Sequence, residues 1–178
     1  MHVGIVCRPS AIGRFSQFDP DHRKPPIYWL YWHNHMNQIR IVLDTCVLVA
    51  AARSRTGASF KLLSMLPSER FELALTVALY TEWQDVLTRP EHMPPGIGAV
   101  EVEGFLSYLV SLAHLQDVYF LWRPFLRDPD DDMVLECAVA SGSQMIVTHN
   151  IRDFSRALSL NVQAMTPADF LEHIRRSS

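Results

Sequence analysis

Acidic side chains occur along this 178-residue chain at positions where metal-dependent chemistry on phosphate esters could be built. Asp44 follows a short apolar run, an acidic run occupies 128–132, and Asp153 follows a second apolar run, while Glu82 lies in an otherwise apolar segment. Carboxylates that gather in one place repel one another, so such a cluster is costly unless a cation lies within it. Ligand sets made only of oxygen select Mg²⁺ or Mn²⁺, and one or two such ions can activate water and hold a phosphodiester.

Each of these acids also has a purely structural explanation. Asp44 could cap the helix that follows it, and the run at 128–132 could be a solvated helix start that complements the helix dipole. Glu82 could face solvent or pair with a nearby arginine, and Asp153 could cap the short helix after it. Several acids follow apolar runs of the kind that form strands, and this recurrence favours one shared metal site over a separate structural explanation for each acid.

Alternating strand and helix patterns predict how the acids are brought together. Because strands and helices alternate, we expect an α/β fold in which helices cover both faces of a parallel sheet. Ligands of such folds bind beyond the carboxyl ends of the strands, where Asp44, the acidic run and Asp153 would then meet. The predicted strands are 39–43, 71–75, 118–122, 145–147 and 162–165, and the predicted helices are 45–53, 59–66, 77–87, 100–115, 130–141, 154–158 and 167–175.

Composition bounds the class of protein. The chain is 48% apolar and 20% charged, which is typical of a globular protein, and no apolar run approaches the roughly 18 residues needed to cross a bilayer. Three widely spaced cysteines indicate a reducing compartment, so we expect a cytoplasmic protein with no membrane association. The net charge of −3 does not indicate nucleic-acid binding, although 14 Arg against 2 Lys suits bidentate phosphate contacts or simply reflects codon bias.

The first 35 residues differ from the rest of the chain. They contain four prolines and no sustained period, so we interpret 1–35 as a flexible N-terminal extension and 36–178 as the folded domain. Met36 shortly precedes the first strand, which suggests that translation could begin there; finding residues 1–35 intact by mass spectrometry of the native protein would refute this. The aromatic cluster at 28–32 is either a docking patch or part of an unstructured leader.

Five segments in order resemble the motif series of PIN-domain nucleases, most closely the VapC-like toxins of bacterial toxin–antitoxin pairs. They are IVLDT at 41–45, GAS at 57–59, TEWQDVL at 81–87, DPDDDMVLECA at 128–138 and IVTHNIRDF at 146–154. The resemblance covers about residues 38–170. It implies a PIN-like three-layer sandwich, with a central parallel sheet of four or five strands flanked by helices, and an endoribonuclease that depends on one or two Mg²⁺ or Mn²⁺ ions.

The resemblance also assigns roles to individual residues. It implies four catalytic and metal-binding acids, with Asp128 as the alternative to the third, and three polar residues that support them. The acids are Asp44, Glu82, Asp131 and Asp153, and the supporting residues are Thr45, Thr148 and Asn150. Two departures from the family pattern stand out: Cys46 replaces an asparagine, which would weaken the support of Asp44, and Asn150 replaces an aspartate, which puts a second metal in doubt.

The resemblance further implies an RNA substrate and an antitoxin partner. Basic residues near the first helices and the acidic loops are candidates for contacts with RNA phosphates, although each could also be ordinary surface charge. These are Arg53, Arg55, Lys61, Arg123, Arg127 and Arg152. The apolar stripe at 100–113 could support a homodimer, receive an antitoxin peptide or belong to the core of its own chain.

Two other functions fit parts of the pattern. A catalytically weak RNA- or protein-binding module would keep the fold and explain Cys46 and Asn150. A phosphohydrolase of the haloacid-dehalogenase type also has a strand that ends in Asp-Thr, but its chemistry needs a second aspartate two residues after the first. Cys46 occupies that position, so this function is disfavoured.

Overall fold

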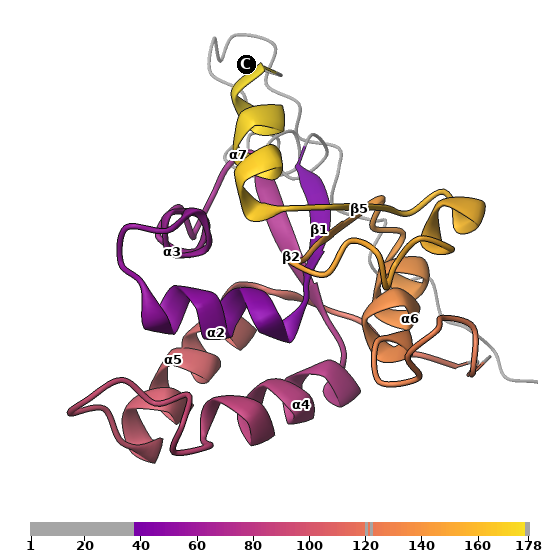
Figure 1. Ribbon diagram of the computed structural model, residues 1–178. Helices are drawn as coiled ribbons and strands as arrows, with labels where there is room; N and C mark the ends of the chain where they lie inside the picture. The colour runs from indigo at the N-terminus through magenta and orange to yellow at the C-terminus, as the bar shows by residue number, and fades with distance from the viewer. Residues whose placement is uncertain (1–37, 120, 122, 177–178) are drawn as a thin grey trace, which may run out of the picture.

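The structure is a computed structural model that describes residues 38–119, 121 and 123–176. Within these residues, five strands alternate with six α-helices and one 3-10 helix (Figure 1). The strands are β1 (Ile39–Leu43), β2 (Phe71–Leu75), β3 (His114–Leu115), β4 (Met145–Val147) and β5 (Gln163–Met165). The helices are α2 (Thr45–Arg53), α3 (Ala58–Leu63), α4 (Val77–Leu87), α5 (Ala99–Leu112), α6 (Asp132–Ser141), η1 (Ala157–Leu160) and α7 (Pro167–Arg176).

All five strands are parallel and lie in the order β3-β2-β1-β4-β5. The central strand β1 pairs with β2 on one side and with β4 on the other, where Leu43 is opposite Val147. The residues that follow these two strands, Asp44 and Thr148, therefore emerge side by side at the carboxyl edge of the sheet. This arrangement confirms the predicted α/β fold with a parallel sheet and gives it five strands.

Helices cover both faces of the sheet. Figure 1 shows α2, α3 and α7 on one side of β1 and β2, and α6 on the other. Because β1 is central, Ile41, Val42 and Leu43 are completely buried, which explains its nearly continuous apolar sequence. The rings of Phe71 in β2 and Phe170 in α7 meet edge to face, with centroids 5.4 Å apart, and so join the last helix to the sheet.

The predicted strand at 118–122 is wrong for the residues of that run that are described. The third strand in chain order is instead β3, at His114–Leu115, which the sequence pattern had included in the preceding helix. Backbone pairing of β3 with β2 ends α5 at Leu112, and after β3 the side chains of Tyr119 and Leu121 are 79% and 70% exposed, so these two residues do not enter the core. An apolar run of five residues does not by itself distinguish a buried strand from an exposed connection.

The apolar stripe predicted at 100–113 lies on α5 and belongs largely to the core of its own chain. Val102, Leu106 and Leu109 are buried against the rest of the fold, whereas Phe105 remains 38% exposed. A homodimer through this stripe stays a prediction.

Two helices begin later than predicted. The acidic run before Asp132 forms turns rather than helix, and η1 replaces the helix predicted at 154–158. Gly142 ends α6 with a φ of +68°, the left-handed conformation that glycine adopts at low cost.

Within the described part of the chain, no helix has both the length and the apolar content that a membrane span requires. The predicted extension at 1–35 and the proposed start at Met36 lie outside the described residues.

Candidate active site

Asp44 follows β1 and caps the first turn of α2, at the carboxyl edge of the sheet. Its carboxylate accepts hydrogen bonds from the backbone N–H of Cys46 at 3.3 Å and from the Thr148 hydroxyl at 2.5 Å. Asp44 is only 6% exposed, and these donors from two chain segments hold its carboxylate in one orientation. The helix-cap explanation and the site role thus describe the same side chain.

Cys46 supports Asp44 more directly than the sequence suggested. Its thiol donates a hydrogen bond to Asp44 Oδ2 at 3.1 Å, and its sulfur accepts one from the backbone N–H of His149 at 3.3 Å. Burial and the adjacent Asp44 charge raise the pKa of the thiol to about 12, so it remains a neutral donor. Sequence reasoning missed this role because it treated position 46 as lacking a good hydrogen-bonding group.

Thr148 connects the ends of β1 and β4. It is completely buried, donates to Asp44 and accepts a hydrogen bond from the backbone N–H of Asn150 at 2.8 Å. Asn150 itself is exposed and contributes to this network through its backbone. Both polar residues predicted at this strand end therefore belong to the network. Thr148 contacts Asp44 directly through its side chain, and the backbone N–H of Asn150 contacts the Thr148 hydroxyl.

Thr45 and Glu82 form the second polar contact of the site. The buried Thr45 hydroxyl, in the first turn of α2, donates to Glu82 Oε1 in α4 at 2.7 Å. The structure thus places the Thr45 hydroxyl against Glu82, whereas the resemblance implied that Thr45 would orient Asp44 or a bound water. Partial burial raises the pKa of Glu82, the hydrogen bond from Thr45 opposes this, and the charge of Asp44 adds to the rise.

Asp131 lies at the point where the acidic side chains come within electrostatic range of one another. Burial and then the charges of Asp44, Asp128, Asp153 and Glu82, in that order, raise the pKa of Asp131 to about 7. Asp131 directly precedes α6, and its side chain is half-buried. The structure therefore brings Asp44, Glu82 and Asp153 into range of Asp131, together with the alternative acid, Asp128.

The raised pKa predicts that Asp131→Asn stabilises the metal-free protein at alkaline pH. The folded chain holds this proton more tightly than the unfolded chain, in which the pKa is near 3.8, so the free energy of unfolding falls as the pH rises from about 4 to 7. With EDTA at pH 8, the variant should be more stable than the wild type by ~1–2 kcal/mol, a figure that allows for solvent screening of a half-buried group. Urea unfolding at pH 8 and pH 4 measures this, and the difference should vanish at pH 4. A wild type that is the more stable form at pH 8 would contradict it.

Asp132 differs from its neighbour in what its side chain does. It is 2% exposed and accepts hydrogen bonds from the backbone N–H groups of Phe125, at 3.0 Å, and Leu126, at 2.8 Å. The loop before α6 is held further by Arg123, which makes a two-pronged ion pair with Glu136 at 2.8 Å. These contacts position the acidic run, and Asp132 is a functional support that sequence reasoning did not identify.

Asp153 reaches the site from the turn after β4. Its backbone N–H donates to the carbonyl of Asn150 at 3.0 Å, and its side chain is half-buried. In the same turn, His149 Nε2 lies 2.9 Å from the hydroxyl of Ser59, a buried residue of α3. This contact ties the turn that carries Asp153 to α3, and Ser59 was not among the predicted site residues.

The donor set has the chemistry of a hard divalent cation site. Carboxylate and hydroxyl oxygens are the ligands that Mg²⁺ and Mn²⁺ prefer. Burial and then the neighbouring negative charges raise the pKa of Asp131, and a cation would relieve the repulsion among those charges. Among residues 38–119, 121 and 123–176, no group of three or more His, Cys, Asp or Glu side chains is arranged so that it could hold a metal ion. The residues thus fit a divalent cation in their charge and in their donor atoms. Their spacing does not yet suit it, so the acidic side chains would have to move closer together to bind the ion.

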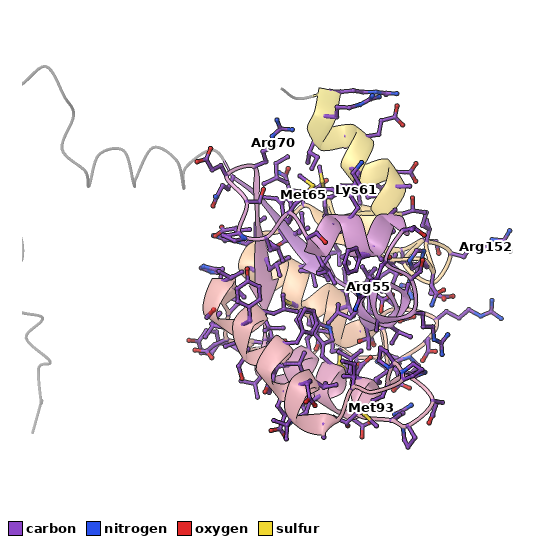
Figure 2. All side chains as sticks on the ribbon, turned by 90° about the vertical axis from the view of Figure 1, so that its left-hand side faces the viewer. Arg55, Lys61, Met65, Arg70, Met93 and Arg152 are labelled. Atoms are coloured by element: carbon purple, nitrogen blue, oxygen red, sulfur yellow. The ribbon has the colours of Figure 1, made fainter. Side chains whose placement is uncertain are left out.

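The predicted RNA contacts divide into two groups. Arg123 is engaged by Glu136, so it is not available to a phosphate. The others are exposed and make no ion pair with any described residue, and Figure 2 shows Arg152 pointing outward at the edge of the molecule. The exposed cations are Arg53, Arg55, Lys61, Arg127 and Arg152.

Comparisons with known proteins agree with this architecture. The family profile of the PIN domain matches residues 40–152, a range that includes Asp44, Glu82 and Asp131 and ends one residue before Asp153. The structure of VapBC2 from Rickettsia felis bound to a DNA fragment from their promoter is similar at 16% identity, with a TM-score of 0.51, over 72% of this chain and 98% of that chain. The structure of VapBC-1 from nontypeable Haemophilus influenzae matches at 14% identity, with a TM-score of 0.49, over 73% of this chain and 99% of that chain.

A comparison with curated protein sequences gave no significant match. At 16% identity, the likeness to the Rickettsia felis structure shows a shared fold. The family profile covers well over half of the chain, including both strands whose ends carry Asp44 and Thr148. The chain therefore belongs to the PIN-domain family.

Proposed function

We propose that this protein is an endoribonuclease that hydrolyses RNA phosphodiesters with the help of Mg²⁺ or Mn²⁺. The observation that carries the proposal is the gathering of acids at the carboxyl edge of the sheet, where Asp44 lies against Thr148 at the ends of β1 and β4 and the charges of Asp44, Asp128, Asp153 and Glu82 all act on Asp131. Ligands of parallel α/β folds bind at this edge, and mutually repelling acids there suit a cation. Membership of the PIN-domain family supports nuclease chemistry.

The side chains that would hold the ion are Asp44, Glu82, Asp131 and Asp153. A bound divalent cation supplies a more acidic water and offsets the charge of the phosphodiester. Thr148 and Cys46 orient Asp44, and Thr45 orients Glu82. Asp131 must lose its proton before it can act as a ligand, so the metal-free protein should bind the ion more tightly as the pH rises through about 7.

Binding RNA beside an acidic site requires local positive charge. The chain has a net charge of −3, so attraction of a polyanion must come from particular side chains rather than from the whole surface. Among these exposed cations, Arg53 ends α2, Arg55 follows it and Lys61 lies in α3. Arg127 and Arg152 adjoin the acidic loops. We propose these five side chains as the phosphate contacts.

The nuclease is further proposed to be the toxin of a bacterial toxin–antitoxin pair, with an antitoxin protein as its inhibitor and the cytoplasm as its location. The resemblance of its motifs to VapC-like toxins supports this, and the fold it shares with the VapBC2 structure is consistent with it. Co-expression with a short protein encoded beside it should abolish the RNA cleavage described next.

The activity test is incubation of the purified chain with labelled single-stranded RNA. We expect cleavage with Mn²⁺ or Mg²⁺ that leaves 5′-phosphate and 3′-hydroxyl ends, loss of at least about a hundredfold of the rate in EDTA, and recovery with excess Mn²⁺. A parallel assay with a small phosphate ester should show no hydrolysis, because Cys46 stands where a phosphohydrolase would need its second aspartate.

A binding module that lacks strong catalysis is the second candidate function. The spacing of the acids favours this function, because among the described residues no three His, Cys, Asp or Glu side chains are close enough together to hold a metal ion. RNA that binds without being cut, with either metal present, would support this function and contradict the nuclease proposal.

A further inference from the structure

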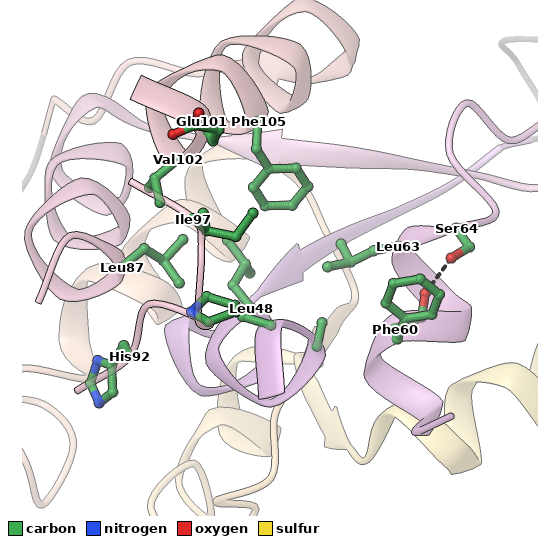
Figure 3. Close-up of a pocket in the computed structure, with 13 residues that line it drawn as sticks. Leu48, Phe60, Leu63, Ser64, Leu87, His92, Ile97, Glu101, Val102 and Phe105 are labelled. Atoms are coloured by element: carbon green, nitrogen blue, oxygen red, sulfur yellow. Dashed lines mark hydrogen bonds between the residues drawn. The ribbon is translucent and has the colours of Figure 1, made fainter. Parts of the chain in front are cut away.

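An apolar groove with a volume of about 320 Å³ lies between α2, α3 and α5, and it shares no residue with the acidic site (Figure 3). Leu48 of α2, Leu63 of α3 and Val102 of α5 contribute to its walls. This volume is within the range of sites that bind apolar ligands and side chains.

The few polar groups in the groove are already engaged within their own segments. The Ser64 hydroxyl donates to the carbonyl of Phe60, His92 Nδ1 contacts the carbonyl of Val86, and Glu101 accepts from the backbone N–H of Gly98. What the groove presents to an occupant is therefore mainly apolar surface. An apolar or aromatic segment fits this surface better than a charged one.

Large apolar side chains at the groove remain partly exposed in the described part of the chain. Phe60 is 37% exposed, Ile97 is 39% exposed and Phe105 is 38% exposed. Figure 3 shows Phe60 and Phe105 on the side of the groove formed by α3 and α5. Covering such side chains would stabilise the fold by ~25 cal/mol for each Å² of apolar surface removed from water.

The described part of the chain begins, at its entry into β1, beside the segment that follows the α3 wall of this groove. Gln38 Nε2 donates to the carbonyl of Ser68 at 2.8 Å, and the hydroxyl of Tyr108 donates to the carbonyl of Leu66 at 3.1 Å. These bonds place the start of β1 beside the connection between α3 and β2, and α5 against the same connection. The groove residue Ser64 is four positions from Ser68, and Phe105 is one helical turn from Tyr108.

The chain carries an aromatic segment within reach of that entry point. Residues 28–32 read Tyr-Trp-Leu-Tyr-Trp, and only five residues separate Trp32 from Gln38. At ~3.3–3.6 Å per extended residue, this linker spans up to about 20 Å. Aromatic rings bury a large apolar area, and the polar atoms of Tyr and Trp can remain at the rim of a groove.

We propose that the segment Tyr28–Trp32 binds the apolar groove of its own chain. A short tether gives the segment a millimolar effective concentration at the groove, so this contact forms ahead of contacts with free partners. An external apolar peptide would have to displace it. The proposal does not rest on nuclease activity, and its test measures binding only.

The test uses the full chain with Trp29→Ser and Trp32→Ser together and a labelled peptide of residues 25–36. We expect the peptide to bind this double variant at least about tenfold more tightly than it binds the wild type, because the variant leaves the groove uncovered. The matched control is Phe15→Ser with Phe18→Ser, which removes two aromatic residues from the same terminal region and should bind as weakly as the wild type. Adding Ile97→Asp to the first variant should remove the binding.

Several results would overturn the proposal. Equal binding to wild type and variant would mean that the groove is open in the natural chain, and no binding to the variant would mean that the segment does not fit. Binding that survives Ile97→Asp would place the peptide on another surface. If the wild-type chain binds the labelled peptide weakly at high protein concentration but tightly after dilution, the segment covers the groove of a neighbouring copy rather than that of its own chain.

A second measurement does not depend on the folding of the tryptophan variants. Ile97→Asp in the otherwise unchanged chain should shift tryptophan emission to the red, because Trp29 and Trp32 would return to water while Trp83 stays fully buried. Unchanged emission in this variant would contradict the contact.

Discussion

Asp44→Asn is expected to reduce RNA cleavage by about a thousandfold or more while leaving the protein folded. Loss of one carboxylate from the ion site removes several kcal/mol of transition-state stabilisation, and each 1.36 kcal/mol is a factor of ten in rate. The fold should persist because asparagine caps helices about as well as aspartate, and its carbonyl oxygen can still accept from the Cys46 backbone. Cleavage of labelled RNA with Mn²⁺ measures the loss.

A second readout separates a change in the site from general damage. After burial, the negative charge of Asp44 does most to raise the pKa of Asp131, so Asp44→Asn should lower that pKa from about 7. An NMR titration of the Asp131 carboxyl would detect it. The matched control is Asp117→Asn, an exposed acid outside the site, which should change neither cleavage nor this pKa. Full activity in the Asp44 variant would remove the proposed site.

Asp132→Ala is expected to destabilise the fold by about 3 kcal/mol, because two backbone N–H groups would lose their acceptor at once. Asp132 is almost completely buried, and it holds Phe125 and Leu126 in the loop that leads to the acidic run. Alanine cannot replace either hydrogen bond, and each buried donor left unsatisfied costs ~1–3 kcal/mol. Urea unfolding of the full chain at pH 7 measures the change.

The neighbouring acid supplies the control for this prediction. Asp130→Ala removes an exposed carboxylate from the same loop and should change the free energy of unfolding by no more than ~0.5 kcal/mol. We also expect RNA cleavage to fall in Asp132→Ala under conditions where the variant remains folded, because Asp131 would lose its fixed position. Equal stability of the two variants would show that the hydrogen bonds of Asp132 do not hold the loop.

The loop has a further anchor that acts on the same residue. Arg156 lies over the ring of Phe125, with its guanidinium carbon 4.4 Å from the ring centroid, and also donates to the carbonyl of Phe125. Phe125 is therefore held through its ring, its N–H and its carbonyl group. This explains how an irregular segment, which lies between the predicted strand at 118–122 and the predicted helix at 130–141, can deliver Asp131 to a defined place.

The local sequence was sufficient to predict the elements that carry the site. The apolar run at Ile39–Leu43 is a central strand, and the stripe at Val77–Leu87 is a helix with the same bounds. These predictions are correct because the spacing of apolar residues is a local property that follows the period of the element they form. The same logic predicted that Asp44 and Asp153 would lie at one edge of the sheet, since both follow strands of one parallel sheet.

Only the tertiary structure decided which partner each polar side chain takes. Thr45 bonds to Glu82 instead of Asp44, the Cys46 thiol supports Asp44, and Asp132 turns to the loop while its neighbour Asp131 turns to the other acids. Neighbouring acids are equivalent in sequence, and they differ only once packing gives one a buried pair of N–H donors and the other a set of like charges. Hydrogen bonds and charge interactions act over a few ångströms between segments far apart in the chain, so no local pattern contains them.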